Sequence, residues 1–150
     1  MKVFENYANF YDSYYRNKDY DSEVNFVLDL AKQNSTPRTV LDIGCGTGGH
    51  LIPFVKKGLK VTGFDLSKTM IMQAEEKLRK TNIKANIQVG DARNYRDGKQ
   101  YDLIVAMFAV MGYLTSNEDF LAGLKTAMIH LNENGLFIFD VWFGPAVLHQ

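Results

Sequence analysis

The sequence lacks the features that are typical of several classes of protein. It contains 1 cysteine in 150 residues, so no disulfide can form within the chain and no oxidising compartment is indicated. Its 17 Lys and Arg residues balance 17 Asp and Glu residues, which argues against binding to nucleic acid or anionic membrane by bulk charge. The longest apolar run, around Leu103–Gly112, is shorter than the roughly 20 residues that span a bilayer. The N-terminal stretch MKVFENYANFYDSYY also lacks the apolar segment of a signal peptide, so we expect a cytoplasmic protein with no nucleic-acid or membrane partner.

What is present is the composition of a globular domain, with 46% hydrophobic and 23% charged residues. The 3 prolines do not cluster into a linker, and no internal repeat is visible. We therefore expect one domain over residues 1–150. Within it, residues 1–37 are expected to form an N-terminal helical lid, residues 38–143 an α/β core, and residues 144–150 a tail.

Apolar residues at helical spacing alternate along the chain with short β-branched runs bounded by turn residues. The helices are predicted at about 22–34, started by Asp21 or Ser22, at 48–57, at 67–81 behind Ser67, and at 117–131. Asn117 is the expected N-cap of the last helix and residues 132–135 are its expected exit. The predicted strands are Thr39–Ile43, Lys60–Phe64, Asn86–Val89, Tyr101–Met107 and Leu136–Trp142.

Strands joined by helices in this way normally lie parallel with right-handed crossovers. The runs LIVAMFAV and LFIFDVWF are almost continuously apolar, as expected for strands buried on both faces. The pattern predicts a doubly wound, Rossmann-like, mostly parallel α/β sheet of strand order 3-2-1-4-5 with helices on both faces. Such sheets bind ligands outside the carboxyl ends of their strands.

The turn after the first predicted strand is dense in glycine, in the sequence VLDIGCGTGGHL. Gly44, Gly46 and Gly49 fit the dinucleotide-binding spacing G-x-G-x-x-G, whereas Gly44, Gly46 and Gly48 fit a tighter G-x-G-x-G. Asp42, just before the turn, would repel a pyrophosphate and attract a sulfonium or an ammonium. This charge favours S-adenosylmethionine as the ligand. An alternative role for Asp42 is to accept backbone N–H groups and shape the turn, and both roles can coexist.

Two further acidic residues follow the second and third predicted strands. Asp65 lies about 20 residues beyond Gly44, the usual offset for a carboxylate that holds ribose hydroxyls. Its alternative role is an N-cap, but Ser67 is available for that. Asp91, in VGDARNY, can pair with the adenine edge together with the Ala92 N–H. Acidic residues at three successive strand ends form a specific constellation.

These residues carry a family resemblance. The segments VLDIGCGTGGHL, VTGFDLS, GDARNY, YDLIVAMF and GLFIFD resemble, in order, the class I S-adenosylmethionine-dependent methyltransferases, over residues 39–143. The segments FYDSYYRNKDY, MFAVMGYL and FDVWF are similar to the N-methyltransferases that dimethylate nucleotide-linked amino sugars. The resemblance implies transfer of a methyl group from S-adenosylmethionine to a small-molecule amine, with S-adenosylhomocysteine as the product.

The resemblance also implies roles for individual residues. Tyr20 would reach the methionine end of the cofactor, Arg16 the cofactor carboxylate, and Tyr15 the acceptor. The spacing between Tyr15 and Lys18 is shorter than in that family. The full set of residues expected to bind the cofactor is Arg16, Tyr20, Asp42, Gly44, Cys45, Gly46, Gly48, Asp65, Leu66, Asp91, Ala92 and Met107.

Other residues leave alternatives open. Tyr113 can orient the acceptor or belong to a packed turn. Cys45, between two glycines, is expected to be a small filler of the turn and not a nucleophile. Trp142 and Phe143 can line the acceptor pocket or pack at the sheet edge. We expect no metal site and name no general base, since an amine that arrives neutral needs none, and we interpret His50 as a helix-surface or packing residue.

The chain departs from the resembled family after the fifth predicted strand. Those enzymes have two further strands, an antiparallel hairpin beside strand five, and neither is predicted here. Strand five is then an apolar edge, which favours pairing with another strand. We expect either a piece of a longer chain or a homodimer in which a second copy covers this edge. Two alternative functions are an NAD(P)-dependent oxidoreductase and a non-catalytic fragment that binds S-adenosylmethionine.

Overall fold

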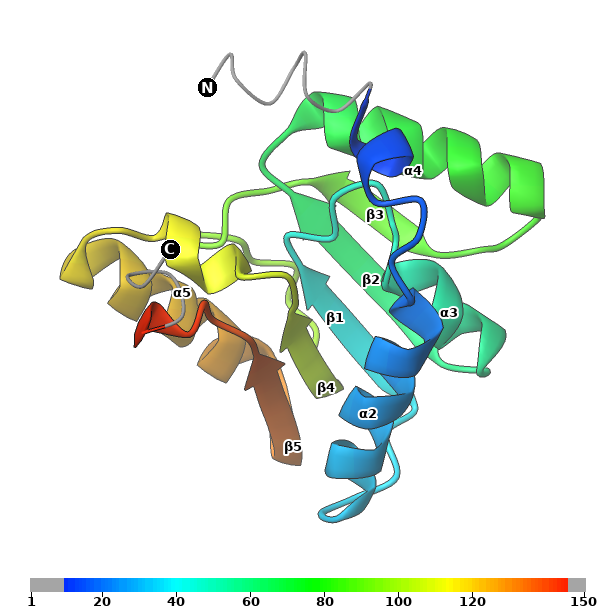
Figure 1. Cartoon of the computed structure of the whole chain (residues 1–150). Helices are drawn as coiled ribbons and strands as arrows, with labels where there is room; N and C mark the ends of the chain where they lie inside the picture. The colour runs from blue at the N-terminus through cyan, green and yellow to red at the C-terminus, as the bar shows by residue number, and fades with distance from the viewer. Residues whose placement is uncertain (1–9, 146–150) are drawn as a thin grey trace.

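The chain forms a parallel five-stranded sheet of order β3-β2-β1-β4-β5. Figure 1 shows it in a computed structural model that describes residues 10–145, so parts of the predicted lid (residues 1–9) and tail (residues 146–150) lie outside the described residues. The predicted strand order and parallel arrangement are confirmed. The strands are β1 (Thr39–Ile43), β2 (Lys60–Asp65), β3 (Asn86–Val89), β4 (Tyr101–Ala106) and β5 (Leu131–Phe139).

Helices cover both faces of this sheet, as predicted (Figure 1). The helices are α2 (Tyr20–Lys32), α3 (Leu51–Lys56), α4 (Lys68–Thr81) and α5 (Asn117–His130), with a 3-10 turn, η1, over Val110–Tyr113. Residues 10–14 are also helical. Among residues 10–145, every helix is too short or too polar to cross a bilayer.

The alternation of side chains along the strands sorts the core into two layers. Val40 and Leu103 pack on the side of α2, α3 and α4, whereas the next residues, Leu41 and Ile104, pack on the side of α5. All four are completely buried. Because strand side chains alternate with a period of two, Asp42 shares the face of Val40 and points into the layer beneath α2, α3 and α4.

Side chains fix the start of three helices. Asp19 accepts a hydrogen bond from the Ser22 N–H, so α2 begins at Tyr20, earlier than predicted. Ser67 caps α4, as predicted. The N-cap of α5 is Ser116 and not Asn117, because Ser116 has the extended backbone that an N-cap needs and its hydroxyl accepts from the Asp119 N–H across 3.1 Å.

The last strand differs most from its prediction. β5 spans Leu131–Phe139, so residues 132–135 lie inside the strand and do not form an exit turn. The pairing with β4 jumps from Tyr101–Leu131 to Leu103–Leu136, and Asn134 takes a left-handed backbone with φ +62°. The predicted turn residues are therefore accommodated as an irregularity within a paired strand. The strand ends at Phe139, before Trp142.

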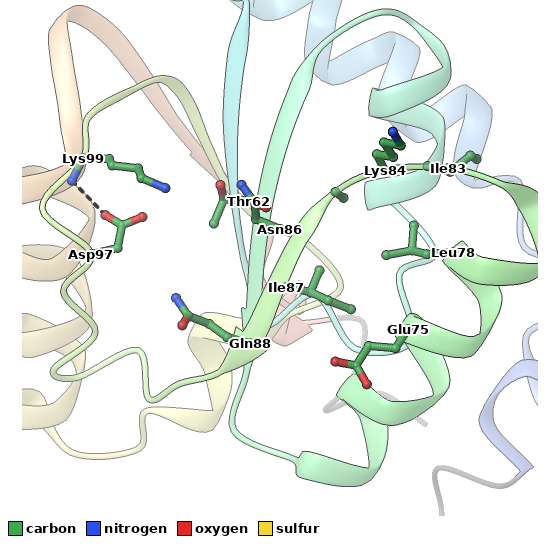
Figure 2. A pocket seen from close by; sticks show the side chains of 11 residues that line it. Thr62, Glu75, Leu78, Ile83, Lys84, Asn86, Ile87, Gln88, Asp97 and Lys99 are labelled. Atoms are coloured by element: carbon green, nitrogen blue, oxygen red, sulfur yellow. Dashed lines mark hydrogen bonds between the residues drawn. The ribbon is translucent and has the colours of Figure 1, made fainter.

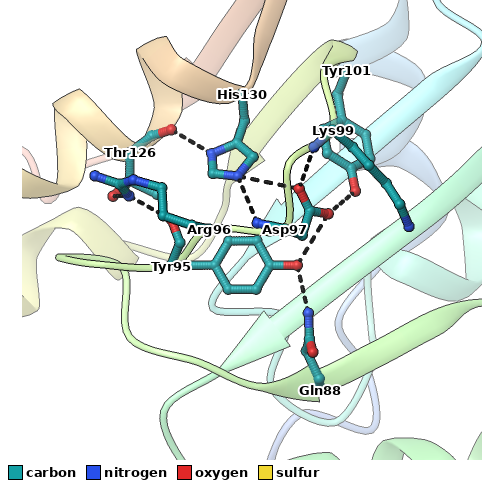
Figure 3. A network of polar contacts seen from close by, with 8 residues as sticks. All are labelled: Gln88, Tyr95, Arg96, Asp97, Lys99, Tyr101, Thr126 and His130. Atoms are coloured by element: carbon teal, nitrogen blue, oxygen red, sulfur yellow. Dashed lines mark hydrogen bonds and ion pairs between the residues drawn. The ribbon is translucent and has the colours of Figure 1, made fainter.

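A buried polar network joins α5 to the segment that follows β3 (Figure 3). His130, 1% exposed, places its Nε2 atom 3.2 Å from Oδ1 of Asp97. The other carboxylate oxygen of Asp97 accepts hydrogen bonds from the Tyr101 hydroxyl at 2.5 Å and the Tyr95 hydroxyl at 3.3 Å. The Tyr95 ring stacks on Phe64 of β2, with centroids 3.9 Å apart. The network thereby fixes the turn that carries Asp91.

Another carboxylate joins three strands at the opposite, amino end of the sheet. Asp102 of β4 accepts hydrogen bonds from the backbone N–H groups of Arg38 (2.8 Å) and Thr39 (3.0 Å) where β1 begins. Its second oxygen accepts from the side-chain amide of Asn132 in β5 across 2.8 Å. Asp102 therefore aligns β1, β4 and β5 at the end away from the glycine turn.

Candidate functional site

The glycine turn after β1 has the left-handed backbone that its sequence suggests. Gly44, Gly46 and Gly48 have φ values of +71°, +53° and +83°. A Cβ atom at Gly44 would lie 2.6 Å from a methyl carbon of Val110, so only glycine fits beside the chain that follows β4. The turn is also tied to β2, because the N–H groups of Gly44 and Cys45 both donate to the Phe64 carbonyl.

Asp65 lies beside this turn at the carboxyl end of β2. One carboxylate oxygen accepts from the Gly46 N–H at 3.0 Å, and the other accepts from the Ser67 N–H at 2.8 Å. Burial raises the pKa of Asp65, although both backbone hydrogen bonds act in the opposite direction. Leu66, which follows it, is half exposed. The structure thus brings the predicted ribose-binding carboxylate to the predicted turn.

Asp42 is a buried carboxylate without a local partner. Asp42 is only 2% exposed, and its Oδ2 atom has no hydrogen-bond partner among the described residues. Burial and the nearby charge of Asp65 raise the pKa of Asp42 to about 8. A buried polar atom without a partner is costly, and a cation placed beside it would offset that cost. This oxygen does not take the alternative role of accepting turn N–H groups.

Cys45 and Met107 lie near these acidic residues. Cys45 is buried, and burial together with Asp42 and Asp65 raises the pKa of its thiol. A thiol kept protonated is a poor nucleophile, which supports the prediction of a small filler. Met107, the first residue after β4, is half-buried.

Asp91 follows Gly90, just beyond the end of β3, and has a partner that the sequence analysis missed. Both of its oxygens accept hydrogen bonds from the Arg93 guanidinium, at 3.0 Å from Nε and 2.6 Å from Nη2. The hydrogen bonds from Arg93 lower the pKa of Asp91. Arg93 also reaches Asp119 at the start of α5, at 3.5 Å. Ala92, between the pair, is half-buried.

The segment before α2 reaches the turns after β1 and β4. The ring of Tyr20 packs so closely on Gly49 that a Cβ there would lie 2.5 Å from Tyr20 Cε1. Burial, and then the charge of Asp12, raises the pKa of Tyr20 to about 12, so its hydroxyl stays protonated at neutral pH. Tyr15 meets the Phe108 ring edge-on at 4.9 Å. α2 itself packs into the core, and the lid over residues 1–37 stays a prediction.

The other predicted residues of this region lie nearer the surface. Arg16 is exposed on the segment before α2. Tyr113, at the end of η1, is 65% exposed. Trp142 and Phe143 follow β5 and are each 70% exposed, so the described residues do not bury them.

Two polar contacts of the N-terminal segment were missed from the sequence. Asp12 accepts a hydrogen bond from the Thr47 hydroxyl at 2.7 Å, and Lys77 of α4 donates to the same carboxylate. His50 is a packing residue and not a surface one: it is 7% exposed, its ring meets the Tyr20 ring edge-on at 4.9 Å, and its Nε2 atom lies 2.5 Å from Glu23 of α2. Burial lowers the pKa of His50, while Glu23 raises it.

The chain after β4 is strained. Phe108 and Ala109 both have left-handed backbones, with φ values of +69° and +57°. Such conformations are uncommon for residues with side chains and persist where the surroundings hold them. Here the Ala109 N–H donates to the Asp140 carboxylate at 2.8 Å, just beyond β5. The strain also explains why β4 ends at Ala106, one residue before the predicted end.

A hollow lies elsewhere in the described structure, along the edge strand β3 (Figure 2). Its volume is about 580 Å³, and Figure 2 shows Asp97 and Lys99 on one side of the strand and Leu78 and Glu75 of α4 on the other. No residue predicted to bind the cofactor lines it. The strand-end residues of the predicted site lie instead at the carboxyl ends of β1, β2, β3 and β4.

Comparison with known proteins decides the family. The model of the methyltransferase domain matches residues 40–135, which include the glycine turn, Asp65, Asp91 and Met107. The chain belongs to the methyltransferase domain family. The family predicted from the sequence is therefore confirmed, and the oxidoreductase alternative finds no support among the relatives.

The relatives of this methyltransferase domain include enzymes that act on amino sugars. A dTDP-3-amino-3,4,6-trideoxy-alpha-D-glucopyranose N,N-dimethyltransferase of Streptomyces venezuelae is 34% identical over 143 residues, covering 93% of this chain and 58% of that protein. The crystal structure of Streptomyces venezuelae DesVI matches with a TM-score of 0.84 and 32% identity, covering 93% of this chain and 59% of that one. CalS10, an amino pentose methyltransferase of Micromonospora echinaspora solved with S-adenosylmethionine bound, matches with a TM-score of 0.82 and 26% identity, covering 91% and 57%. The chain spans about three fifths of the length of these relatives.

Proposed function

We propose that this methyltransferase domain binds S-adenosylmethionine and serves methyl transfer to the amine of a small acceptor, of the class of nucleotide-linked amino sugars. The observation that carries the proposal is the acidic constellation around the glycine turn, above all the buried, unpartnered Oδ2 atom of Asp42. A phosphate-bearing dinucleotide fits this arrangement poorly, because its negative charge would lie near Asp65 and oppose ionisation of the buried Asp42, whereas a cation would favour it. The names of the relatives support the amino-sugar acceptor.

The proposal assigns a residue or group of residues to each part of the cofactor. Asp91 and the Ala92 N–H would receive the adenine edge, and Asp65 the ribose hydroxyls. Asp42 would ionise when the cationic end of the cofactor lies beside it, and its carboxylate would then face that positive charge. The remaining residues proposed to bind the cofactor are Arg16, Tyr20, Gly44, Cys45, Gly46, Gly48, Leu66 and Met107.

Bound S-adenosylmethionine supplies a methyl group on a positively charged sulfur. The contribution of the protein is then to align the acceptor nitrogen with that methyl group and to exclude water. Tyr15, Phe108 and Tyr113 lie on the segments available to line the acceptor side. An amine that arrives neutral attacks through its own lone pair, so no side chain is assigned as a general base.

Calorimetric titration with S-adenosylmethionine tests the cofactor assignment. We expect Asp65→Ala to weaken binding by about tenfold or more, since one charge-assisted hydrogen bond is worth about 1.5–3 kcal/mol. Asp29→Ala removes an exposed carboxylate of α2 that pairs with Lys32, and should leave the affinity unchanged. Equal affinities for wild type and Asp65→Ala would remove the ribose assignment.

Transfer of a labelled methyl group distinguishes an enzyme from a domain that only binds S-adenosylmethionine. We expect transfer from methyl-labelled S-adenosylmethionine to a dTDP-amino sugar, and NADH should not raise the melting temperature as S-adenosylhomocysteine does. Tight binding of S-adenosylmethionine without transfer to any amine would favour the non-catalytic alternative.

A further inference from the structure

An ammonium group of the chain itself occupies an aromatic cage near the glycine turn. Nζ of Lys18 lies 4.5 Å from the centroid of the Phe108 ring and 5.4 Å from that of Tyr20. Both distances are within the roughly 6 Å reach of a cation–π contact. The carboxylate of Glu23 pairs with the same ammonium, and the Lys18 side chain is only 16% exposed. We call Phe108, Tyr20 and Glu23 the cation cage.

The cation cage lies where this sheet is expected to bind ligands. Phe108 follows β4, and Tyr20 packs on Gly49 in the turn that follows β1. β1 and β4 are the neighbouring strands at which the strand order reverses, and the crevice at their carboxyl ends is the usual ligand site of such sheets.

The position of the Phe108 ring is maintained at an energetic cost. Its left-handed backbone is strained, and the next residue, Ala109, is left-handed as well. The hydrogen bond from Ala109 to Asp140 and the edge contact of Tyr15 hold this conformation. A strained aromatic residue that faces a cation indicates a role in binding, because a relaxed loop would suffice for packing alone.

The cage can exchange one cation for another without leaving its carboxylate isolated. Glu23 is paired on one side with Lys18 and on the other with His50, whose Nε2 atom lies 2.5 Å away. If Lys18 leaves, His50 still faces the carboxylate. Lys18 itself lies in the irregular segment between residues 10–14 and α2, so its side chain can turn to solvent without disturbing a helix.

We propose that the cation cage is a subsite for an organic cation, and that Lys18 fills it until a ligand displaces the lysine. The identity of the ligand rests on the proposed function, which offers two cations of this chemistry: the sulfonium of the cofactor and the ammonium of the acceptor. The methylated ammonium suits the cage especially, because methyl groups weaken hydration of the cation while aromatic faces still attract it.

Tetramethylammonium ion is the probe for the cage, with its affinity measured by NMR titration. We expect Lys18→Met to bind the ion at least about fivefold more tightly than wild type, because the internal competitor is gone. Phe108→Leu and Tyr20→Leu should each weaken binding at least about fivefold, because the π face is lost. Lys32→Met is the matched control, since Lys32 is an exposed α2 lysine paired with Asp29, and should bind like wild type.

Titrations with S-adenosylmethionine and S-adenosylhomocysteine, which differ in the charge on sulfur, then identify the cation. If the sulfonium occupies the cage, Phe108→Leu weakens the binding of S-adenosylmethionine more than that of S-adenosylhomocysteine. If the acceptor ammonium occupies it, the two cofactor forms are affected equally and tetramethylammonium still binds beside S-adenosylmethionine. Equal tetramethylammonium affinities in wild type, Lys18→Met and both aromatic variants overturn the inference. Failure of both cofactor forms to bind, with the cage titrations as expected, overturns the proposed function instead.

Discussion

The carboxylate of Asp65 accepts a hydrogen bond from the backbone N–H of Gly46 across 3.0 Å, which joins the end of β2 to the turn after β1. Its other oxygen is bound to Ser67 at the start of α4. A carboxylate has about four lone-pair sites, so two hydroxyl groups can still be received. Asp65→Asn would lose the charge and one of the two backbone hydrogen bonds, because its amide nitrogen cannot accept, whereas Asp65→Ala would lose the charge and both. We therefore expect Asp65→Ala to weaken cofactor binding at least as much as Asp65→Asn.

Gly49→Ala should disturb the N-terminal segment without touching the acidic residues. The new Cβ would lie 2.5 Å from Tyr20 Cε1, so the ring must move away from the turn. We expect a loss of about 1–3 kcal/mol in the free energy of unfolding, measured in urea. Gly112→Ala is the control, because a Cβ there meets open space and the backbone is not left-handed. Similar losses in the two variants would contradict the close packing of Tyr20.

The buried Asp42 should make stability depend on pH. Its native pKa of about 8 lies above its unfolded value near 3.9, so between these values the native protein keeps a proton that the unfolded chain has lost. The stabilising contribution is full below about pH 4 and is lost as pH rises through about 8.

Asp42→Asn should remove this dependence, because the amide cannot ionise. We expect the stability of wild type relative to Asp42→Asn to fall steadily from pH 5 to pH 8 in urea unfolding experiments. A constant difference between the two proteins would show that Asp42 is ionised in the native protein throughout. Added S-adenosylmethionine should reduce the difference at pH 8, because a bound cation favours the ionised carboxylate.

Asp97→Ala should destabilise the protein strongly, by about 2–4 kcal/mol, because the Tyr101 and Tyr95 hydroxyls both lose the carboxylate to which they donate in the buried network. Burial opposes ionisation of Asp97, but the hydrogen bond from Tyr101 and its other partners lower its pKa overall. Its contribution is therefore present above the unfolded pKa and is lost as pH falls through the lower native pKa. Asp29→Ala, at an exposed ion pair, should change stability by less than about 1 kcal/mol.

We propose that a second copy of the chain covers the β5 edge in solution. The edge carries Phe139, 38% exposed, and is followed by Trp142 and Phe143, each 70% exposed. Light scattering should show dimers that increase with concentration, and Trp142→Lys should shift the equilibrium toward monomer. Phe26→Lys changes an exposed aromatic residue of α2 and should have no such effect. A monomer at every concentration would count against the proposal.

The sequence predicted the strands where local and global signals agree. β1 and β3 have the predicted bounds, because β-branched residues recur in both of them and turn residues flank them. The start of β5 was missed because the segment Asn132–Gly135 has the composition of a turn. In the structure, pairing with β4 overrides that local preference.

The acidic residues of the site were predictable because each lies at or just beyond the carboxyl end of a strand, within a short motif. The contacts of Lys18, Glu23 and His50 were not, since they bring together a loop, α2 and the turn after β1. The position of Arg93, two residues after Asp91, could have suggested that the two side chains pair. An arginine at that spacing is equally compatible with a side chain that extends into solvent. Such pairings depend on tertiary packing and not on local pattern.

Asp102 has a consequence for how this domain can change. It fastens β1, β4 and β5 at the end farthest from the glycine turn, through the backbone N–H groups of Arg38 and Thr39 and the side-chain amide of Asn132. Substitutions at the carboxyl ends of the strands can then change which acceptor molecules bind, while Asp102 keeps the strands aligned at their amino ends. Variant libraries aimed at new acceptors should therefore vary the residues at the carboxyl ends of the strands and leave Asp102 unchanged.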